Sequence, residues 1–482
     1  MAETTRPAHA SFAAYRAGLL TRKINPRDEP PRAARRSGMV NLPRLTYLDT
    51  VLIAAIKSAF GRRLTYVIQV RTLKNTGFKA TRSPDHNNSR DPILSTTQTA
   101  VLGQPAPPVA RPAPLTVDMG DNAEITRDLY GLLGLPVDAV DFRTLIQAMD
   151  AAAAKREPFL ISTPNVNFLI KSHQDVAFRD SMLLSDVCLA DGMPLIWLAK
   201  LLRVPIQERV AGSDLFGRLK SRTDNRLRVF LFGGTGDLAE QVGTKLNAEK
   251  CGLECVGVLN PGFGSVEELS SPEIIARINA SGADLLAVFL NAEKAQSWLL
   301  RNHHRLTIPI RAQFGATINF EAGTIRRAPP LMRSTGFEWL WRIKEEPHLW
   351  RRYWADGKAL FQVLCTCVLP LAIAARITRQ PVEFAIRSSQ HDEGMTISLI
   401  GAATADKANS LLPFVTQAVR DHKSIEINLA GVDYMDGRFF GVLIGVKRRL
   451  ARQSLSLTIV GLSPRLRRIF RLNRFEFLLS DG

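Results

Sequence analysis

The stretch LRVFLFGGTGDLAEQVGTKLNAEKCGLECVGVLN, residues 227–260, decides the fold class of this chain. It opens with an apolar strand that runs into glycines, continues as a helix and returns as a second apolar strand. Further buried strands are predicted at residues 159–165, 187–190, 284–291 and 308–316. Strands that alternate with helices of about ten to fifteen residues predict a mostly parallel α/β sheet. We place this domain at residues 116–330.

The overall composition excludes several classes of protein. A chain of 482 residues has room for about three domains, and 45% hydrophobic residues provide a core and exclude wholesale disorder. Five cysteines exclude a disulfide scaffold. No pair of Cys-x-x-Cys motifs is present, so the sequence does not indicate a structural zinc site either.

The net charge of +18 is spread unevenly. Residues 1–115 hold 18 Lys and Arg against 6 Asp and Glu, together with proline-rich and turn-rich runs. We interpret them as a basic, disordered leader. A basic chain attracts polyanions, whether nucleic acid, a membrane surface or a phosphate-bearing substrate. Because most of the excess lies in the leader, charge alone does not support a nucleic-acid partner.

Two further segments follow the predicted sheet. Residues 331–379 are basic and aromatic, and four of the six tryptophans lie at residues 339–354. This pattern predicts helices that associate with a membrane surface, with a helical pair packed against the core as the alternative. An uncharged run at 359–375 is short for a spanning helix, so a buried or surface helix is the prediction. Residues 380–482 then form a second, smaller α/β unit.

Polar residues follow the predicted strands at the edge where parallel sheets bind ligands. Thr163, Asn165 and Asn167 follow the first strand, where they can cap a helix or bind a hydroxyl or phosphate. Asp191 follows the second strand, as a helix cap or a general base. Arg209 suits bidentate phosphate binding, with a surface ion pair as the alternative.

The turn GGTG follows the third strand, with Gly233 and Gly234 at its start. Backbone amides in such a turn can hold a phosphate, or the glycines can simply make a tight turn. The full G-x-G-x-x-G fingerprint is absent, so a dehydrogenase is poorly supported.

Taken together, the motifs resemble the WecG/TagA/CpsF family of bacterial glycosyltransferases, glycosyltransferase family 26. The motifs, in order, are TPNVN (163–167), ADG (190–192), ERVAGSD (208–214), FGG (232–234) and the stretch GATINFEAGTIRRAPPLMRSTGFEWLWRIKEEP (315–347). The resemblance covers roughly residues 129–361. It implies a Rossmann-like sheet domain with a helical appendage.

The resemblance also implies an activity. A sugar, as a UDP-linked hexose or N-acetylhexosamine, moves with inversion from a nucleotide-sugar donor to a polyprenyl-pyrophosphate-linked acceptor, for a cell-surface or exported polysaccharide. No metal or cofactor is expected. The enzyme works peripherally on the cytoplasmic face of the inner membrane.

The site residues that the resemblance implies follow residue by residue. Asp191 is the general base, and Thr163 and Asn165 match the T-x-N motif. Arg209 and Asp214 match the E-R-x-x-G-x-D motif. The basic appendage that reaches over the site supplies further candidates in Arg342, Arg351 and Arg352.

One departure from the family pattern affects the site. The glutamine of the usual G-x-P-K-Q-E-x-W segment falls on Ala295, and Gln296, one position along, is the substitute candidate for substrate binding. The alternative function is therefore a catalytically degenerate regulatory protein that acts through its C-terminal unit.

That unit, about residues 382–482, resembles a STAS domain, the fold of anti-sigma factor antagonists. In phosphorylated members a serine follows the aspartate of the D-S-x-G turn, whereas here Gly437 follows Asp436. The resemblance thus implies a unit that binds a partner protein, a nucleotide or another subunit, without phosphoryl switching at this position.

Overall fold

The computed structural model describes residues 123–206, 208–377, 383–392 and 394–479. These lie within one compact unit of the chain, residues 96–482. The predicted leader, residues 1–115, lies outside the described residues.

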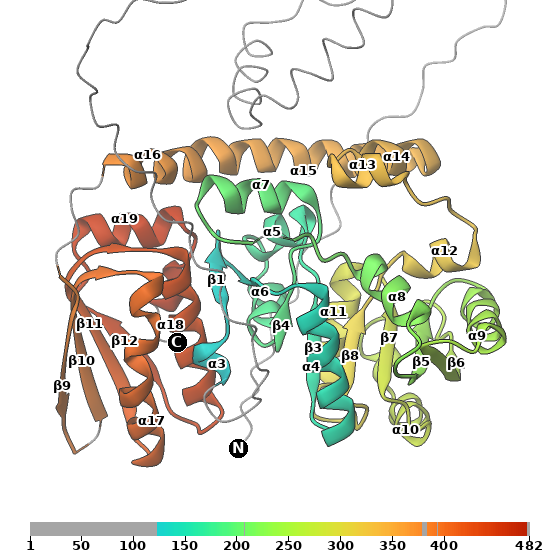
Figure 1. Ribbon diagram of the computed structural model, residues 1–482, viewed down its shortest axis with the longest axis horizontal. Coiled ribbons are helices and arrows are strands. Elements are labelled where there is room, and N and C mark those ends of the chain that lie inside the picture. The colour runs from blue at the N-terminus through green and yellow to red at the C-terminus, as the bar shows by residue number, and fades with distance from the viewer. Residues whose placement is uncertain (1–122, 207, 378–382, 393, 480–482) are drawn as a thin grey trace, which may run out of the picture. The chain divides into compact units, whose positions relative to one another are not determined.

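A six-stranded parallel sheet forms the centre of the larger domain (Figure 1). Its strand order is β4-β3-β8-β7-β5-β6, and every neighbouring pair is parallel. The strands are β3 (Phe159–Ser162), β4 (Val187–Cys188), β5 (Leu227–Gly233), β6 (Leu253–Leu259), β7 (Leu285–Phe289) and β8 (Ile310–Gln313). The predicted fold class is confirmed, and the carboxyl ends of all six strands meet at one edge of the sheet.

Helices cover both faces of this sheet, because successive residues of a strand point to opposite sides. Val229 and Leu231 of β5 pack into one apolar cluster, while Phe230 and Phe232 pack into another. The helices of the first cluster are α4 (Phe142–Lys155), α8 (Gly212–Ser221) and α9 (Leu238–Glu249). Those of the second are α10 (Pro272–Ala280) and α11 (Ala292–Asn302).

The segment between β3 and β4 forms two short helices. They are α5 (Val166–Ser172) and α6 (Val176–Leu183), and Asp175 caps the second by accepting a bond from the Phe178 amide. Helix α7 (Met193–Leu201) follows β4, and α12 (Thr317–Ala322) follows β8.

The appendage is a series of helices along one side of both domains (Figure 1). It comprises α13 (Pro330–Ser334), α14 (Glu338–Glu345), α15 (Trp350–Val363), a π-helical turn (Leu364–Val368) and α16 (Leu369–Ile377). Val363, Cys367 and Val368 are buried in a cluster with residues of α5, α6 and α7. One side of this long helix is therefore seated on the protein.

The opposite side of the same helix carries exposed apolar residues. Trp350, Trp354, Phe361, Leu369 and Ile373 are each 44–64% exposed. The π-helical turn lies within this helix, between the residues exposed on α15 and those exposed on α16. Within the described residues, Pro347–Ala374 is also the one helix long and apolar enough to cross a membrane, which is weak evidence by itself.

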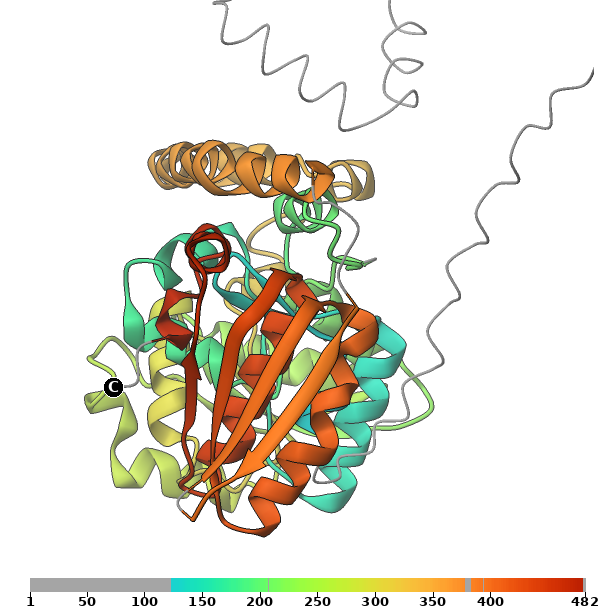
Figure 2. The same cartoon turned by 90° about the vertical axis from the view of Figure 1, so that its left-hand side faces the viewer.

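The C-terminal unit has a mixed four-stranded sheet, seen in Figure 2. Strand order is β12-β11-β10-β9, with only the β9–β10 pair antiparallel. The elements are β9 (Ala385–Gln390), β10 (Gly394–Ala403), α17 (Leu412–Arg420), β11 (Ser424–Met435), α18 (Gly437–Ala451), β12 (Leu457–Val460) and α19 (Pro464–Leu472). The small mixed α/β unit predicted from the sequence is confirmed.

Three glycines let α18 pack directly on the backbone of the larger domain. A Cβ on Gly441 would lie 1.9 Å from the Leu129 carbonyl oxygen, and one on Gly445 would lie 2.3 Å from the Glu124 carbonyl oxygen. Gly437, four residues earlier, faces the Gly131 carbonyl oxygen. The covered backbone belongs to α3 (Ala123–Thr126) and β1 (Leu129–Leu132), and the latter forms a hairpin with β2 (Leu135–Asp138).

Polar contacts complete this interface. The buried Arg438 guanidinium donates to the Leu129 and Ile125 carbonyls at 3.2 and 2.9 Å. Arg448 donates to the Ser185 carbonyl at 2.7 Å and pairs with Asp186 at 3.3 Å. Ile125 and Leu129 themselves belong to the apolar core of the C-terminal unit. The α18 face, including the position of the missing switch serine, is therefore occupied by the chain itself.

Candidate active site

Three loops meet at the carboxyl edge of β3 and β4 and are joined by backbone hydrogen bonds. The Asp191 amide donates to the Pro164 carbonyl at 2.8 Å, which joins the loop after β4 to the loop after β3. The Val210 amide donates to the Ala190 carbonyl at 3.0 Å, which adds the loop before α8. The loops that carry Thr163, Asp191 and Arg209 therefore meet at this edge from three separate segments.

Gly192 shapes the turn that presents Asp191. Its φ of +111° is a conformation that residues with a Cβ rarely adopt, so the Asp-Gly pair itself sets the direction of the chain into α7. On the other side, Asp138 of β2 accepts a bond from the Cys188 amide of β4 at 2.7 Å. The hairpin that α18 covers thus holds the strand that ends three residues before Asp191.

The surroundings of Asp191 favour the neutral carboxyl group. Burial raises the pKa of Asp191 to about 7, and the negative charges of Glu338 and Asp214 act in the same direction. The Arg209 guanidinium and a hydrogen bond from the Gly212 amide oppose them. A carboxylate with a pKa near neutrality is suited to accept a proton from a substrate hydroxyl.

A cluster of arginines and carboxylates links the sheet domain to the appendage. Arg209 donates to Asp214 at 2.6 Å and to Glu338 of α14 at 2.9 Å. Asp214 also accepts bonds from Arg327 at 2.5 Å and Arg333 at 3.0 Å. Asp214 and Glu338 thus hold three guanidinium groups, of which Arg209 acts on the charge of Asp191.

This cluster borders a pocket of about 420 Å³. Its walls are Phe142, Glu208, Arg209, Asp214, Gly217, Arg218, Ser221 and Arg327. In the pocket wall the three guanidinium groups of Arg209, Arg218 and Arg327 outnumber the two carboxylates, Glu208 and Asp214, so the pocket suits an anion. Among the described residues, no three His, Cys, Asp or Glu side chains are grouped so that they could hold a metal ion.

The loop after β3 both caps a helix and contacts the appendage. Asn165 caps α5 by accepting bonds from the Asn167 and Phe168 amides at 3.0 and 3.3 Å. The Asn167 side-chain amide reaches Asp356 of α15 at 3.4 Å. Thr163 is buried, with its hydroxyl near Gly212. In this structure Asn165 therefore serves as a helix cap, which was one of its two interpretations, and binding of a hydroxyl through its side-chain amide nitrogen stays a prediction.

The structure places Gly233 and Gly234 in a tight turn, which was one of their two interpretations, and phosphate binding at this turn stays a prediction. The Gly234 amide donates to the Phe289 carbonyl at 3.2 Å, so in this structure it is not offered to a phosphate. Gly233, with a φ of +99°, leaves a Cβ only 3.0 Å from the same carbonyl oxygen. The pair makes the tight turn that joins β5 to β7 and α9, which was the alternative interpretation.

Gln296 is also not placed to bind a substrate. It is fully buried, and its side chain bonds with the Ser162 hydroxyl at the end of β3. Ala295, at the position of the family glutamine, is equally buried in the core between sheet and helix. Both side chains of α11 are buried, and the hydrogen bond from Gln296 to Ser162 stabilises the end of β3.

The appendage arginines predicted for the site lie apart from its centre. Arg342 pairs with Glu346 at 2.6 Å and lies over the Phe320 ring. Arg352 is exposed on α15 and lies over the Tyr353 ring. The arginines that do reach the cluster are Arg327 and Arg333, which lie in the quoted stretch 315–347 but were not among the predicted site residues.

Comparison with known proteins identifies the larger domain. Residues 130–370, half of the chain, match the glycosyl transferase WecG/TagA/CpsF family. The chain belongs to this family. Its relatives in the WecG/TagA/CpsF family include an N-acetylglucosaminyldiphosphoundecaprenol N-acetyl-beta-D-mannosaminyltransferase of Bacillus spizizenii, 25% identical over 42% of this chain and 78% of that protein. A protein of the same description from Bacillus subtilis is also 25% identical, over the same shares.

The C-terminal unit has relatives of its own. Residues 386–480 match the family described as Mlab, STAS domain. Among solved structures, phosphorylated SpoIIAA of Bacillus matches with 19% identity and a TM-score of 0.18, over 20% of this chain and 91% of that one. An anti-sigma factor antagonist of Mycobacterium paratuberculosis matches with 18% identity and a TM-score of 0.19, over 21% and 87%. The chain is thus a family glycosyltransferase domain followed by a STAS domain.

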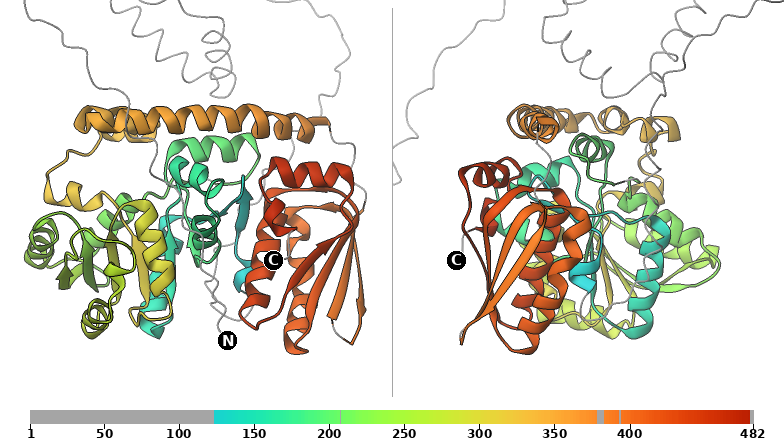
Figure 3. Two further views of the ribbon diagram at one scale, coloured as in Figure 1. Left: turned by 180° about the vertical axis from the view of Figure 1, so that it is seen from behind. Right: turned by 60° about the vertical axis from the view of Figure 1, so that its left-hand side comes forward.

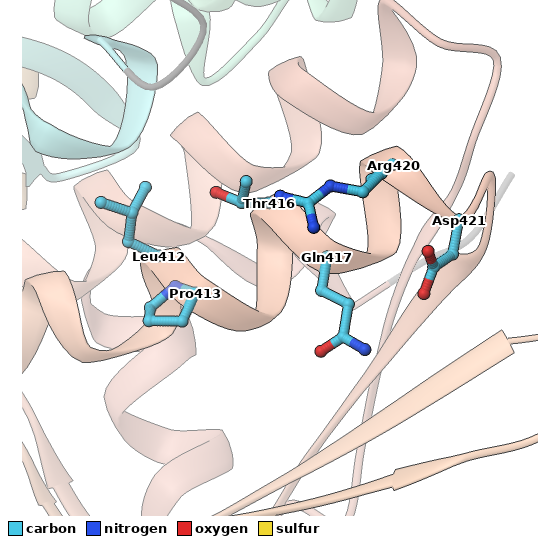
Figure 4. Close-up of a pocket in the computed structure, with 6 residues that line it drawn as sticks. All are labelled: Leu412, Pro413, Thr416, Gln417, Arg420 and Asp421. Carbon is cyan, nitrogen blue, oxygen red and sulfur yellow. The ribbon is translucent and has the colours of Figure 1, made fainter.

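A second depression, of about 460 Å³, lies on the STAS domain (Figure 4). Its six lining residues all come from α17 and its C-terminal cap: Leu412, Pro413, Thr416, Gln417, Arg420 and Asp421. Because one helix supplies the whole lining, we assign this depression no ligand.

We expect Asp214 to hold the appendage over the site. Asp214→Asn leaves Arg209, Arg327 and Arg333 without their shared carboxylate and should destabilise the fold by about 1–3 kcal/mol. Hydrogen exchange at residues 327–345 should quicken. Asp150→Asn is the matched control, because Asp150 also binds an arginine, Arg222, at 2.8 Å, on a part of the sheet domain away from the appendage. Unchanged exchange at 327–345 would contradict this role.

Proposed function

We propose that this protein transfers a sugar from a UDP-sugar to a polyprenyl-pyrophosphate-linked sugar, in the synthesis of a cell-surface or exported polysaccharide. The observation that carries the proposal is the position of Asp191. Its raised pKa, its place at the ligand-binding edge of the sheet and the adjacent arginines together suit acid–base chemistry beside an anion.

In this mechanism Asp191 accepts the proton of the acceptor hydroxyl. The hydroxyl oxygen forms a bond to the anomeric carbon as the bond from that carbon to the UDP oxygen breaks. Attack from the face opposite UDP inverts the configuration. Thr163 and Asn165, on the adjoining loop, are placed to orient a sugar hydroxyl.

The departing UDP carries negative charge that needs compensation in the transition state. Arg209, Arg327 and Arg333 are the nearest supply, and in the free structure Asp214 and Glu338 neutralise them. We propose that the donor pyrophosphate draws on these guanidinium groups when it binds. Such groups, already oriented by carboxylates, stabilise the leaving group without a large rearrangement.

We also propose that the appendage meets the cytoplasmic membrane surface, where the acceptor lipid lies. Trp350 and Trp354 are 52% and 64% exposed on the outer side of α15, with Arg351 and Arg352 exposed beside them. Tryptophan favours the membrane interface, and arginine attracts anionic lipid. Asn167 contacts Asp356 where α5 meets α15, which joins the appendage to the loop after β3.

A transfer assay tests the proposal. Purified protein is incubated with UDP-linked hexoses and N-acetylhexosamines and a short-chain polyprenyl-pyrophosphate N-acetylglucosamine, and the products are identified by mass spectrometry. We expect one donor to extend the acceptor by one sugar, with inversion at the anomeric carbon. The absence of transfer and of donor binding across the set would favour instead a regulatory protein that acts through its STAS domain.

A further inference from the structure

Helix α19 of the STAS domain carries a row of exposed arginines. Leu466 and Phe470 are buried in the core of the domain, and Ile469 packs against it, so one side of the helix is seated on the STAS domain. The outward residues include Arg465, Arg467, Arg468 and Arg471, all of which are exposed. Among the described residues, none of the four forms an ion pair, and α19 itself contains no acidic residue.

This arrangement is unfavourable in the isolated protein. Arginines three or four residues apart, such as Arg465 with Arg468 and Arg467 with Arg471, repel each other along a helix. Arg465 also stands in the first turn, where the helix dipole disfavours a positive charge. A nearby anionic surface would remove both costs.

The position of α19 identifies such a surface. It lies alongside α16 and the π-helical turn of the appendage, as Figure 1 and the rear view in Figure 3 show. Leu369 and Ile373, exposed on α16, continue the apolar row of α15 to this end. An apolar row flanked by arginines is the pattern of helices that lie in the interface of anionic membranes.

We propose that α19 and α16 together form a docking surface for anionic lipid headgroups, so that the STAS domain anchors the enzyme beside the appendage. This rests on the membrane-surface action in the proposed function and extends it to a domain outside the glycosyltransferase family match. The glycine-lined contact of α18 holds the STAS domain in the fixed orientation that puts α19 and the appendage on the same side. The headgroup phosphates accept hydrogen bonds from the guanidinium groups.

Vesicle sedimentation with the full chain tests the proposal. The protein is mixed with vesicles of phosphatidylcholine alone, or of phosphatidylcholine with one third phosphatidylglycerol. One variant replaces four arginines of α19 by glutamine: Arg465→Gln, Arg467→Gln, Arg468→Gln and Arg471→Gln. It should bind the anionic vesicles about 10- to 100-fold more weakly, since each arginine near an anionic surface adds to the free energy of binding. Binding to neutral vesicles, which depends on the exposed aromatic residues, should change little.

A control variant separates local from overall charge. Arg226→Gln, Lys250→Gln, Arg387→Gln and Arg420→Gln remove the same charge from exposed positions on β9, α17 and the loops of the sheet domain. This control should bind anionic vesicles as the parent does. An equal loss in both variants, or no loss in the α19 variant, would overturn the proposal.

Two further readouts keep the outcome clear. Thermal unfolding should show the α19 variant at least as stable as the parent, because only exposed, mutually repelling charges are removed. Transfer to a water-soluble acceptor should persist in it. If no donor is used by any form but the arginines still govern vesicle binding, only the proposed activity fails. Arginine-dependent binding to RNA without binding to anionic vesicles would overturn the lipid assignment.

Discussion

Replacement of Asp191 by asparagine should reduce sugar transfer by about 10²- to 10⁴-fold while the protein becomes more stable. Asparagine keeps the shape of the side chain but cannot accept the proton of the acceptor hydroxyl. The expected stability gain is roughly 1–3 kcal/mol near pH 8, because burial penalises the ionised carboxylate and raises the pKa of Asp191 to about 7. Transfer assays and chemical denaturation at several pH values measure both effects.

The direction of the pH effect follows from the raised pKa. Below about pH 4 Asp191 is protonated in both folded and unfolded chains, so the substitution should not change stability. The cost of ionisation grows up to about pH 7 and is constant above it. In the parent enzyme, kcat/KM should fall as the pH drops below about 7, because the base becomes protonated. The exposed Asp224→Asn serves as control, and a transfer-competent Asp191→Asn variant would remove Asp191 from the mechanism.

The second large effect is expected at Gly441, where α18 meets β1. Gly441→Ala places a Cβ 1.9 Å from the Leu129 carbonyl oxygen, and backbone on both sides must move. We expect a loss of about 2–4 kcal/mol in the free energy of unfolding. Transfer should fall too, since β1 pairs with β2, and Asp138 of β2 holds β4 just before Asp191.

A second glycine in a helix provides the comparison. A Cβ added to Gly357 of α15 would have no neighbouring atom within 4 Å, so Gly357→Ala should raise stability by about 0.5–1 kcal/mol. Both variants replace a helical glycine by alanine, so the difference between their free energies of unfolding in urea reports the backbone contact at Gly441 rather than helix propensity. Equal behaviour of the two alanine variants would mean that α18 does not depend on close backbone contact.

The sequence predicted the strands of the sheet domain and the loop that carries Asp191 well. The position of Asp191 at the edge of the sheet could be predicted because its Ala-Asp-Gly loop directly follows an apolar strand. The two strands within residues 227–260 could be predicted from their apolar runs. The insertion of β8 between β3 and β7 could not be predicted, because strand order depends on contacts far apart in the chain. β9 was missed for another reason: it is a mostly exposed edge strand with little apolar signal.

The meeting of Arg327 and Arg333 at Asp214 could not be predicted from the sequence either. Nothing local marks Arg327 or Arg333 as partners of Asp214, which lies more than a hundred residues earlier. Gln296 shows the opposite error, because a polar residue near an expected motif was assigned to ligand rather than core. Its partner, Ser162, lies 134 residues away.

The shared core of α18 and the hairpin has a consequence for synthesis of the chain. Leu129 emerges from the ribosome long before Arg438, its hydrogen-bonding partner 309 residues later. At a synthesis rate of about 5–20 residues per second, Arg438 is made roughly 15–60 s after Leu129. During that interval Ile125 and Leu129 lack the apolar surroundings they have in the finished protein. Nascent chains should therefore engage chaperones at this segment, and a chain that stops before α18 should be prone to aggregate.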